Sequence, residues 1–319
     1  MPTEVDPGLA GLSDTLILAT VLLYVVAMVA YALDLAFGRA RTADPERRLV
    51  AAGGVDAADA ATGTAEAPAA GGEGRERPAW AARAGAVAVA LSWLGWAANA
   101  GAVVTRGVAV GRWPWGNMYE FVVAICLAAV TAFLLMQARQ PVRFLGAFVS
   151  AAAALGIGFA VRYLHVQAGP VVPALNSYWI AIHVSAAIIA SGLFIIAGTS
   201  GILFLARKDG PSRLPGRAEL ESLAHRAIVL AFPVWTFAVI AGALWADKAW
   251  GRYWGWDPKE VWAFITWVAY AAYLHARVTA GWRGKAATIV QLIAFATLLF
   301  NLVGVNIFIS GLHSYAQVP

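Results

Sequence analysis

Eight apolar stretches, each long enough to cross a lipid bilayer, limit what this chain can fold into. A helix needs roughly 20 apolar residues to span about 30 Å of hydrocarbon. Since 61% of the 319 residues are hydrophobic and only 13% are charged, a water-soluble globule is excluded. We predict an all-α polytopic membrane bundle of about eight transmembrane helices, over residues 15–37, 82–105, 117–138, 144–162, 178–206, 226–246, 260–276 and 286–310.

The basic residues are divided unevenly between the two sides of this predicted bundle. Connections on one side hold 17 of the 23 Lys and Arg residues, and connections on the other side hold six. Basic loops stay in the cytoplasm, so the richer side is predicted to be cytoplasmic and both termini to lie outside. The net charge of +5 is then a topology signal, and no nucleic-acid partner is expected.

Three regions are predicted along the chain. Residues 1–37 hold a transmembrane anchor helix that is retained, because no cleavage site of small residues follows its apolar run. Residues 38–81 are rich in Ala and Gly and nearly lack large apolar groups, which predicts a disordered cytoplasmic linker. Residues 82–319 form the membrane domain that carries the candidate site.

Tryptophans crowd the predicted outer connection 247–262. Trp250, Trp254, Trp256 and Trp262 offer indole faces on which a flat, largely apolar ligand can stack, and haem b is the leading candidate. The alternative is a belt of interfacial tryptophans of the kind that many membrane proteins carry.

Polar residues in the same segment have two interpretations each. Asp257, followed by Pro258 and with Glu260 at the third helical position, is a good helix N-cap, and it is also a candidate site residue. Arg252 and Lys259 are candidates to pair with haem propionates or to remain solvated charges at the interface.

A second aromatic connection, from Gly111 to Phe121, leads into the span 117–138. Asn117 is a candidate N-cap there, with Glu120 at the third helical position as in a capping box. This connection is also a candidate wall of the same cavity.

Two histidines far apart in the sequence are predicted to reach the same outer side. His183 follows Trp179 by four residues, which places both on one helix face, and His313 follows the last span. Because haem iron accepts an imidazole nitrogen on each side, we predict that His183 and His313 ligate one iron, with Trp179 nearby. Packed or surface histidines are the alternative.

The other histidines differ in position. His275 lies 16 residues beyond Lys259, or about 24 Å along a helix, near the cytoplasmic side. It is either the ligand of an inner haem site or an interfacial residue. No role is assigned to His165 or His225.

Several motifs resemble one known family. Trp250 to Trp262 resembles the tryptophan-rich WWD signature of haem-handling membrane proteins. Further segments resemble the CcsA (ResC) branch of System II cytochrome c biogenesis. They are Pro114, Asn117 and Tyr119-Glu120; Pro173 to His183; Ala263 to Trp267; Tyr273-Leu-His-Ala-Arg277; and Gly311-Leu-His-Ser-Tyr315. The resemblance runs from about residue 111 to 315.

The resemblance implies roles for three histidines. His183 and His313 match the family's external pair of axial ligands, and His275 matches a membrane-embedded histidine that takes part in moving haem from the cytoplasmic side. Haem would be carried to the outer face of the cytoplasmic membrane and positioned there for thioether attachment to CxxCH of an apocytochrome c. The protein would be one component of a haem lyase-type synthase.

Partners are implied as well. The resemblance predicts a membrane partner of the ResB/CcsB type and an apocytochrome c. Since Cys126 is the only cysteine and lies in an apolar run, a separate partner must reduce the CxxCH thiols. A membrane electron carrier of the cytochrome b type and a haem exporter without attachment chemistry remain alternatives.

Overall fold

The computed structural model describes residues 5–37, 78–171, 175, 177–208, 210 and 212–313, and within these ranges it contains helices and no strands. The predicted all-α architecture is confirmed. The elements are α1 (Pro7–Phe37), α3 (Ala79–Val110), α4 (Met118–Arg139), η1 (Arg143–Leu145), α5 (Gly146–Phe159), η2 (Ala160–Leu164), α6 (Tyr178–Ala206), α7 (Arg217–Trp250), α8 (Pro258–Val278), α9 (Gly284–Leu299), η4 (Phe300–Gly304) and α10 (Val305–Phe308).

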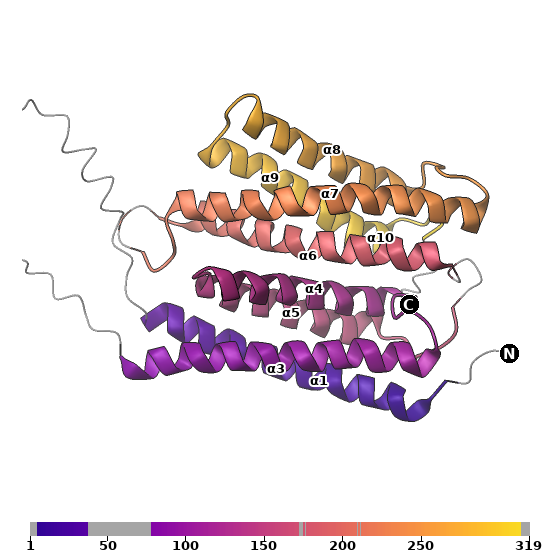
Figure 1. Ribbon diagram of the computed structural model, residues 1–319, viewed down its shortest axis with the longest axis horizontal. Coiled ribbons are helices and arrows are strands. Elements are labelled where there is room, and N and C mark those ends of the chain that lie inside the picture. The colour runs from indigo at the N-terminus through magenta and orange to yellow at the C-terminus, as the bar shows by residue number, and fades with distance from the viewer. Residues whose placement is uncertain are drawn as a thin grey trace, which may run out of the picture.

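Seven helical segments of the described residues are long and apolar enough to cross a membrane, which makes this a multi-pass membrane protein. The remaining predicted span, 260–276, corresponds to α8, which has 21 residues and so is about 31 Å long. It carries Lys259, Glu260 and Arg277 near its two ends, and these charges lower its mean hydropathy. It runs alongside α7 and α9 (Figure 1).

Two predicted boundaries need correction. Helix α3 begins at Ala79, so the last residues assigned to the linker 38–81 are helical; residues 38–77 lie outside the described part of the chain. Helix α7 continues to Trp250, where Gly251 ends it with a positive φ of 70°. The tryptophan-rich connection therefore covers 251–257 and not 247–262.

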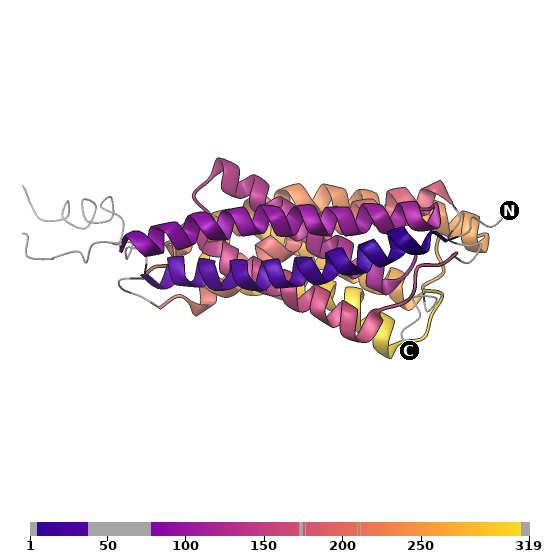
Figure 2. The same ribbon diagram turned by 90° about the horizontal axis from the view of Figure 1, so that it is seen from below.

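The helices lie roughly along one common axis (Figures 1 and 2). The start of α1, the α7–α8 connection and α10 lie at the same end of the bundle, as Figure 1 shows. At this end the backbone N–H of Asp6 donates to the carbonyl of Ala109, 3.0 Å away, which ties the start of α1 to the last turn of α3. We call it the outer end, following the predicted orientation.

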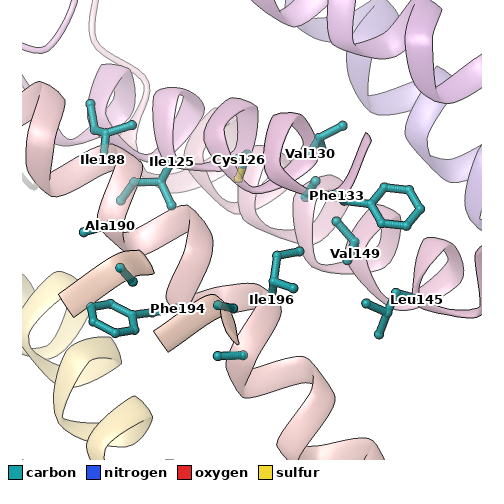
Figure 3. Close-up of a cluster of buried hydrophobic side chains, with 14 of the residues drawn as sticks. Ile125, Cys126, Val130, Phe133, Leu145, Val149, Ile188, Ala190, Phe194 and Ile196 are labelled. Atoms are coloured by element: carbon teal, nitrogen blue, oxygen red, sulfur yellow. The ribbon is translucent and has the colours of Figure 1, made fainter. Parts of the chain in front are cut away.

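The core lies where α4, α5 and α6 meet (Figure 3). Ile125 and Phe133 of α4, Val149 of α5 and Ile196 of α6 are buried together. A Cβ on Gly192 of α6 would lie 2.8 Å from the backbone of α4, so the glycine permits this close approach. Small residues at helix contacts are typical of membrane bundles.

Candidate functional site

A cavity that is open to solvent lies at the outer end, between α6, α7, α8 and the C-terminal segment, and it encloses about 1070 Å³ when its open part is included. Most of its lining side chains are apolar or aromatic, and they include Trp115, Trp235, Trp245, Trp250 and Trp254. His183 and His313 both line it. A concave apolar space with a few polar groups is the usual form of a site for a small organic ligand.

His183 is fixed on the cavity wall by α7. It lies in the second turn of α6, and its Nδ1–H donates to the carbonyl of Ala238 at 2.7 Å. The ring lies against Gly242, where an added Cβ would come within 2.8 Å of it. Because Nδ1 is held by a carbonyl, Nε2 is the nitrogen suited to a metal.

His313 is fixed by the start of α8. Its Nδ1 lies 2.8 Å from Oδ2 of Asp257, and Oδ1 of the same carboxylate accepts the N–H of Leu312. Burial lowers the pKa of His313 below its ordinary value, although the Asp257 carboxylate acts in the opposite direction. The imidazole is therefore neutral at neutral pH, the form in which histidine ligates metals.

Asp257 confirms its predicted capping role and has a second one. Its side chain accepts the N–H of Lys259 in a capping box with Glu260. Burial raises the pKa of this carboxyl, but the hydrogen bonds from His313 and Leu312 outweigh burial and hold it below its ordinary value. Asp257 therefore stays ionised and orients His313, as carboxylates commonly do for metal-ligating histidines.

Trp245 neighbours both histidines and was not singled out from the sequence. Its ring stacks near His183, with centroids 6.1 Å apart and planes 9° apart, and lies edge-on to His313 at 5.8 Å. One indole therefore neighbours both imidazoles and links the two walls that carry them. Its position in the same helix as Trp250 could have indicated that it lies near the site. The sequence predicts that this helix ends at residue 246, however, which places Trp250 in the connection and separates it from Trp245.

The predicted tryptophans occupy different places. Trp250 and Trp254 line the cavity, and the Trp250 ring lies 5.4 Å from that of His313. Trp262, one turn into α8, packs instead on Phe300 with ring centroids 4.2 Å apart. Trp256 is 69% exposed and has a positive φ of 58°, so it projects from the connection outside the cavity lining.

Trp179 and Arg252 stand beside the cavity and do not line it. Trp179 packs in a small cluster with Leu175, Ile180 and Trp245, so it supports the wall from behind. Arg252 is exposed, and its guanidinium lies over Gly255, where no Cβ could fit. Neither side chain is brought to the ring nitrogens of the two histidines.

The α3–α4 connection supplies a further wall. Trp115, Gly116 and Asn117 line the cavity, and the side chain of Asn117 caps α4 by accepting the N–H of Glu120 at 2.9 Å. The capping predicted for Asn117 is confirmed. The cavity is thus closed partly by the first half of the chain.

The remaining histidines lie elsewhere. His275 is exposed in the last turns of α8, far along the helix from Lys259, with its Nδ1 3.4 Å from Oγ1 of Thr279. His165 lies 3.4 Å from Asp14, and His225 lies 3.4 Å from the hydroxyl of Tyr273. None of the three lines the cavity.

The geometry fits a porphyrin. Two imidazoles with Nδ1 held by fixed acceptors and indole faces on the walls are the features that a planar disc with a central iron requires. The described residues bring together no group of three or more His, Cys, Asp or Glu side chains that could hold a bare metal ion.

Comparisons with known proteins point in the same direction. The family described as "Cytochrome C assembly protein" matches residues 115–313, which include the tryptophan-rich connection 251–257 and both cavity histidines. A cytochrome c biogenesis protein CcsA from Chlamydomonas reinhardtii is 37% identical over 64% of this chain and 61% of its own length. The CcsA proteins of Trieres chinensis (34%, over 66% of this chain and 80% of their length) and Synechocystis sp. (30%, over 74% and 89%) are similar as well.

Among solved structures, the cytochrome c haem lyase CcmF has a similar fold. The TM-score is 0.59 at 16% sequence identity, and the match covers 92% of this chain and 46% of that protein. At this identity the likeness concerns the fold alone.

Fold and site together define a multi-pass helical membrane protein with a tryptophan-walled, two-histidine cavity at one end. The chain belongs to the CcsA family of cytochrome c biogenesis proteins. The predicted family is confirmed.

Proposed function

We propose that this protein binds haem between His183 and His313 and presents it, on the outer face of the cytoplasmic membrane, for attachment to apocytochrome c. The observation that carries the proposal is that these two histidines, far apart in sequence, line one cavity with each Nδ1 tied to an acceptor. Both rings are thereby oriented before a ligand arrives.

The distribution of charge supports the orientation. Arg207, Arg217, Arg277 and Arg283 gather at the end of the bundle opposite the cavity, where Arg217 donates to the carbonyl of Arg207 and Arg283 to that of Arg277. A basic end marks the cytoplasmic side. The cavity then faces outward.

The role of the protein in the attachment reaction is positioning. Each thiol of CxxCH adds across one haem vinyl group: a sulfur–carbon bond forms, the thiol hydrogen goes to the neighbouring carbon, and no net oxidation occurs. Cys126 is buried in the bundle and takes no part. Reduced thiols must therefore come from apocytochrome c, kept reduced by a separate protein.

A membrane partner of the ResB/CcsB type completes the proposed path. His275 is exposed on α8 toward the cytoplasmic end, which suits a ligand shared between this chain and a second membrane protein. Haem would pass from this inner site to the outer cavity.

Co-expression with the partner and an apocytochrome c tests the proposal. We expect covalent haem on the apocytochrome, lost with His183→Ala or His313→Ala and restored by added imidazole, which can replace the missing ligand. Haem that reaches the outside without becoming attached would favour an exporter. Attachment that persists in both variants would refute ligation by these histidines.

A further inference from the structure

Three consecutive helices in the first half of the chain recur in the second half with a constant offset in residue number. Helices α3, α4 and α5 recur as α7, α8 and α9, and the offset that takes Gly111 to Gly251 relates all three pairs. These two glycines both end a helix with a positive φ, of 62° and 70°. At the same offset, Asn117 and Asp257 both cap the next helix through their side chains.

Finer details repeat as well. Glu120 and Glu260 are equivalent, and each accepts a backbone N–H of the preceding connection at 2.8 Å. The donors are Gly116 and Gly255, and Gly255 lies one residue before the position equivalent to Gly116. The π-helix η2 and the π-helix η4 begin and end at equivalent residues. π-Helical turns are rare, so their recurrence at the same offset supports an internal repeat.

The packing of the helices follows the same pattern. Helix α1 packs on α3 and α5 in the way that α6 packs on α7 and α9. Helices α1 and α6 are related by a larger offset, the one that takes Tyr24 to Phe194. Tyr24 lies against Gly95 of α3, and Phe194 lies against Trp235 of α7, which is the residue equivalent to Gly95. We call α1, α3, α4 and α5 the first unit and α6, α7, α8 and α9 the second unit. Because each unit has four long helices, both units begin at the outer end, as in parallel membrane repeats.

The cavity has a closed counterpart in the first unit. A small pocket of about 210 Å³ lies among α1, α3 and α4 at the same end. Each residue lining it has its equivalent, at the offset of its own helix, among the residues lining the large cavity. The two spaces are therefore equivalent parts of the two units.

Bulky and charged side chains fill the counterpart pocket. Arg106 is 3% exposed, and its Nε lies 2.9 Å from Glu120, which also binds Arg112 at 2.8 Å. The position of Arg106 is held by Ala246 in the second unit, and that of Ile17 by Ala187. These two replacements make room in the second unit.

At other equivalent positions, the second unit carries side chains of the proposed haem site. His183 stands where the first unit has Ser13, and Trp254 stands where it has Pro114. The proposed haem ligand and an indole wall are thus among the residues that distinguish the open cavity from the closed pocket. Lys259 also differs from its equivalent, Tyr119, and it has no role in the site described above.

Lys259 brings a basic side chain to the cavity wall. Its Nζ donates to the carbonyl of Asn301 at 2.7 Å, and no carboxylate of the described residues lies within 4 Å of it in an ion pair. The neighbouring Asp257 is bound to His313 and Leu312, and Glu260 is bound to backbone N–H groups. An ammonium group has three donors, so two remain for a ligand.

We propose that the cavity is the opened copy of a duplicated pocket, and that Lys259 is the ionic anchor in it for a carboxylate of the ligand. The inference rests on the proposed function, in which the ligand is haem with its two propionate groups. A charge-assisted hydrogen bond at a partly buried site gives the anchor both strength and direction.

Titration of the purified full-length protein with haem and with haem dimethyl ester, in which both carboxylates are masked, tests the anchor. We expect Lys259→Met to weaken haem binding roughly ten- to a hundredfold and to leave binding of the ester unchanged. Lys259→Arg should restore part of the affinity for haem. Lys248→Met is the matched control, because Lys248 is an exposed lysine at the same end that pairs with Asp247.

Two results would overturn the anchor: an equal loss for haem and ester, which means that Lys259 only supports the fold, or no loss for either. The visible spectra of His183→Ala and His313→Ala distinguish failure of the Lys259 anchor from failure of the proposed function. If those variants keep bis-imidazole haem, the proposed function fails, whatever Lys259 does.

Discussion

The carboxylate of Asp257 and the imidazole of His313 join the start of α8 to the C-terminal segment, with Oδ2 and Nδ1 2.8 Å apart. The same carboxylate caps α8 through the N–H of Lys259 and holds the N–H of Leu312. Gly311 allows this contact, since a Cβ there would lie 2.6 Å from Oδ1. One side chain therefore both starts the helix and sets the position of the proposed ligand.

Asp257→Asn separates these two roles. Asn is as good a helix N-cap as Asp, so the melting temperature should change little. The neutral amide polarises and orients His313 less well, and we expect haem affinity to fall about tenfold, as for other partners of metal-ligating histidines. Titration followed by visible absorption measures the affinity; an unchanged value would show that the carboxylate is needed only as a cap.

Gly242→Ala should displace the ring of His183 without removing it. The added methyl group would lie 2.8 Å from the imidazole, so we expect loss of most of the low-spin bis-imidazole spectrum, close to the effect of His183→Ala. Gly158→Ala is the control, because a Cβ there meets no atom within 4 Å. A wild-type spectrum in Gly242→Ala would mean that His183 has more room than its packing indicates.

Trp254 and Trp256 should differ in their effects. Trp254 lines the cavity, so we expect Trp254→Ala to lower haem affinity by about tenfold through lost stacking. Trp256 is largely exposed with a strained positive φ, so Trp256→Gly should leave haem affinity unchanged and slightly raise thermal stability. Parallel haem titrations and melting curves of the purified variants decide the matter, and equal losses of affinity would place both indoles on the ligand.

His275→Ala should interrupt delivery and not binding. We expect less haem in the outer cavity when the protein is isolated from cells together with its partner, while haem added to the purified protein binds as in wild type. His225→Ala serves as the control, since His225 also lies toward the basic end and contacts Tyr273. Full occupancy in cells would remove His275 from the path of haem.

Much of the fold could be predicted because hydrophobic length is a local property. Apolar runs between charged connections are sufficient to define the spans. The ends of α3 and α7 were misplaced because a helix continues past its apolar part until a residue such as Gly251 ends it. The internal repeat was missed because most residues of the two units differ, and only their caps, glycines and π-helical turns coincide.

The sequence by itself determined the membrane architecture, the capping role of Asp257 and the placing of two histidines at one end of the bundle. Only the tertiary structure decided that Trp245 neighbours both of those histidines, that Trp262 and Trp256 lie outside the cavity lining, and that Ala246 and Ala187 leave the cavity open. The reason is physical. Span length and capping depend on neighbours along the chain, whereas an empty space exists only where side chains of several helices meet and one of them is small.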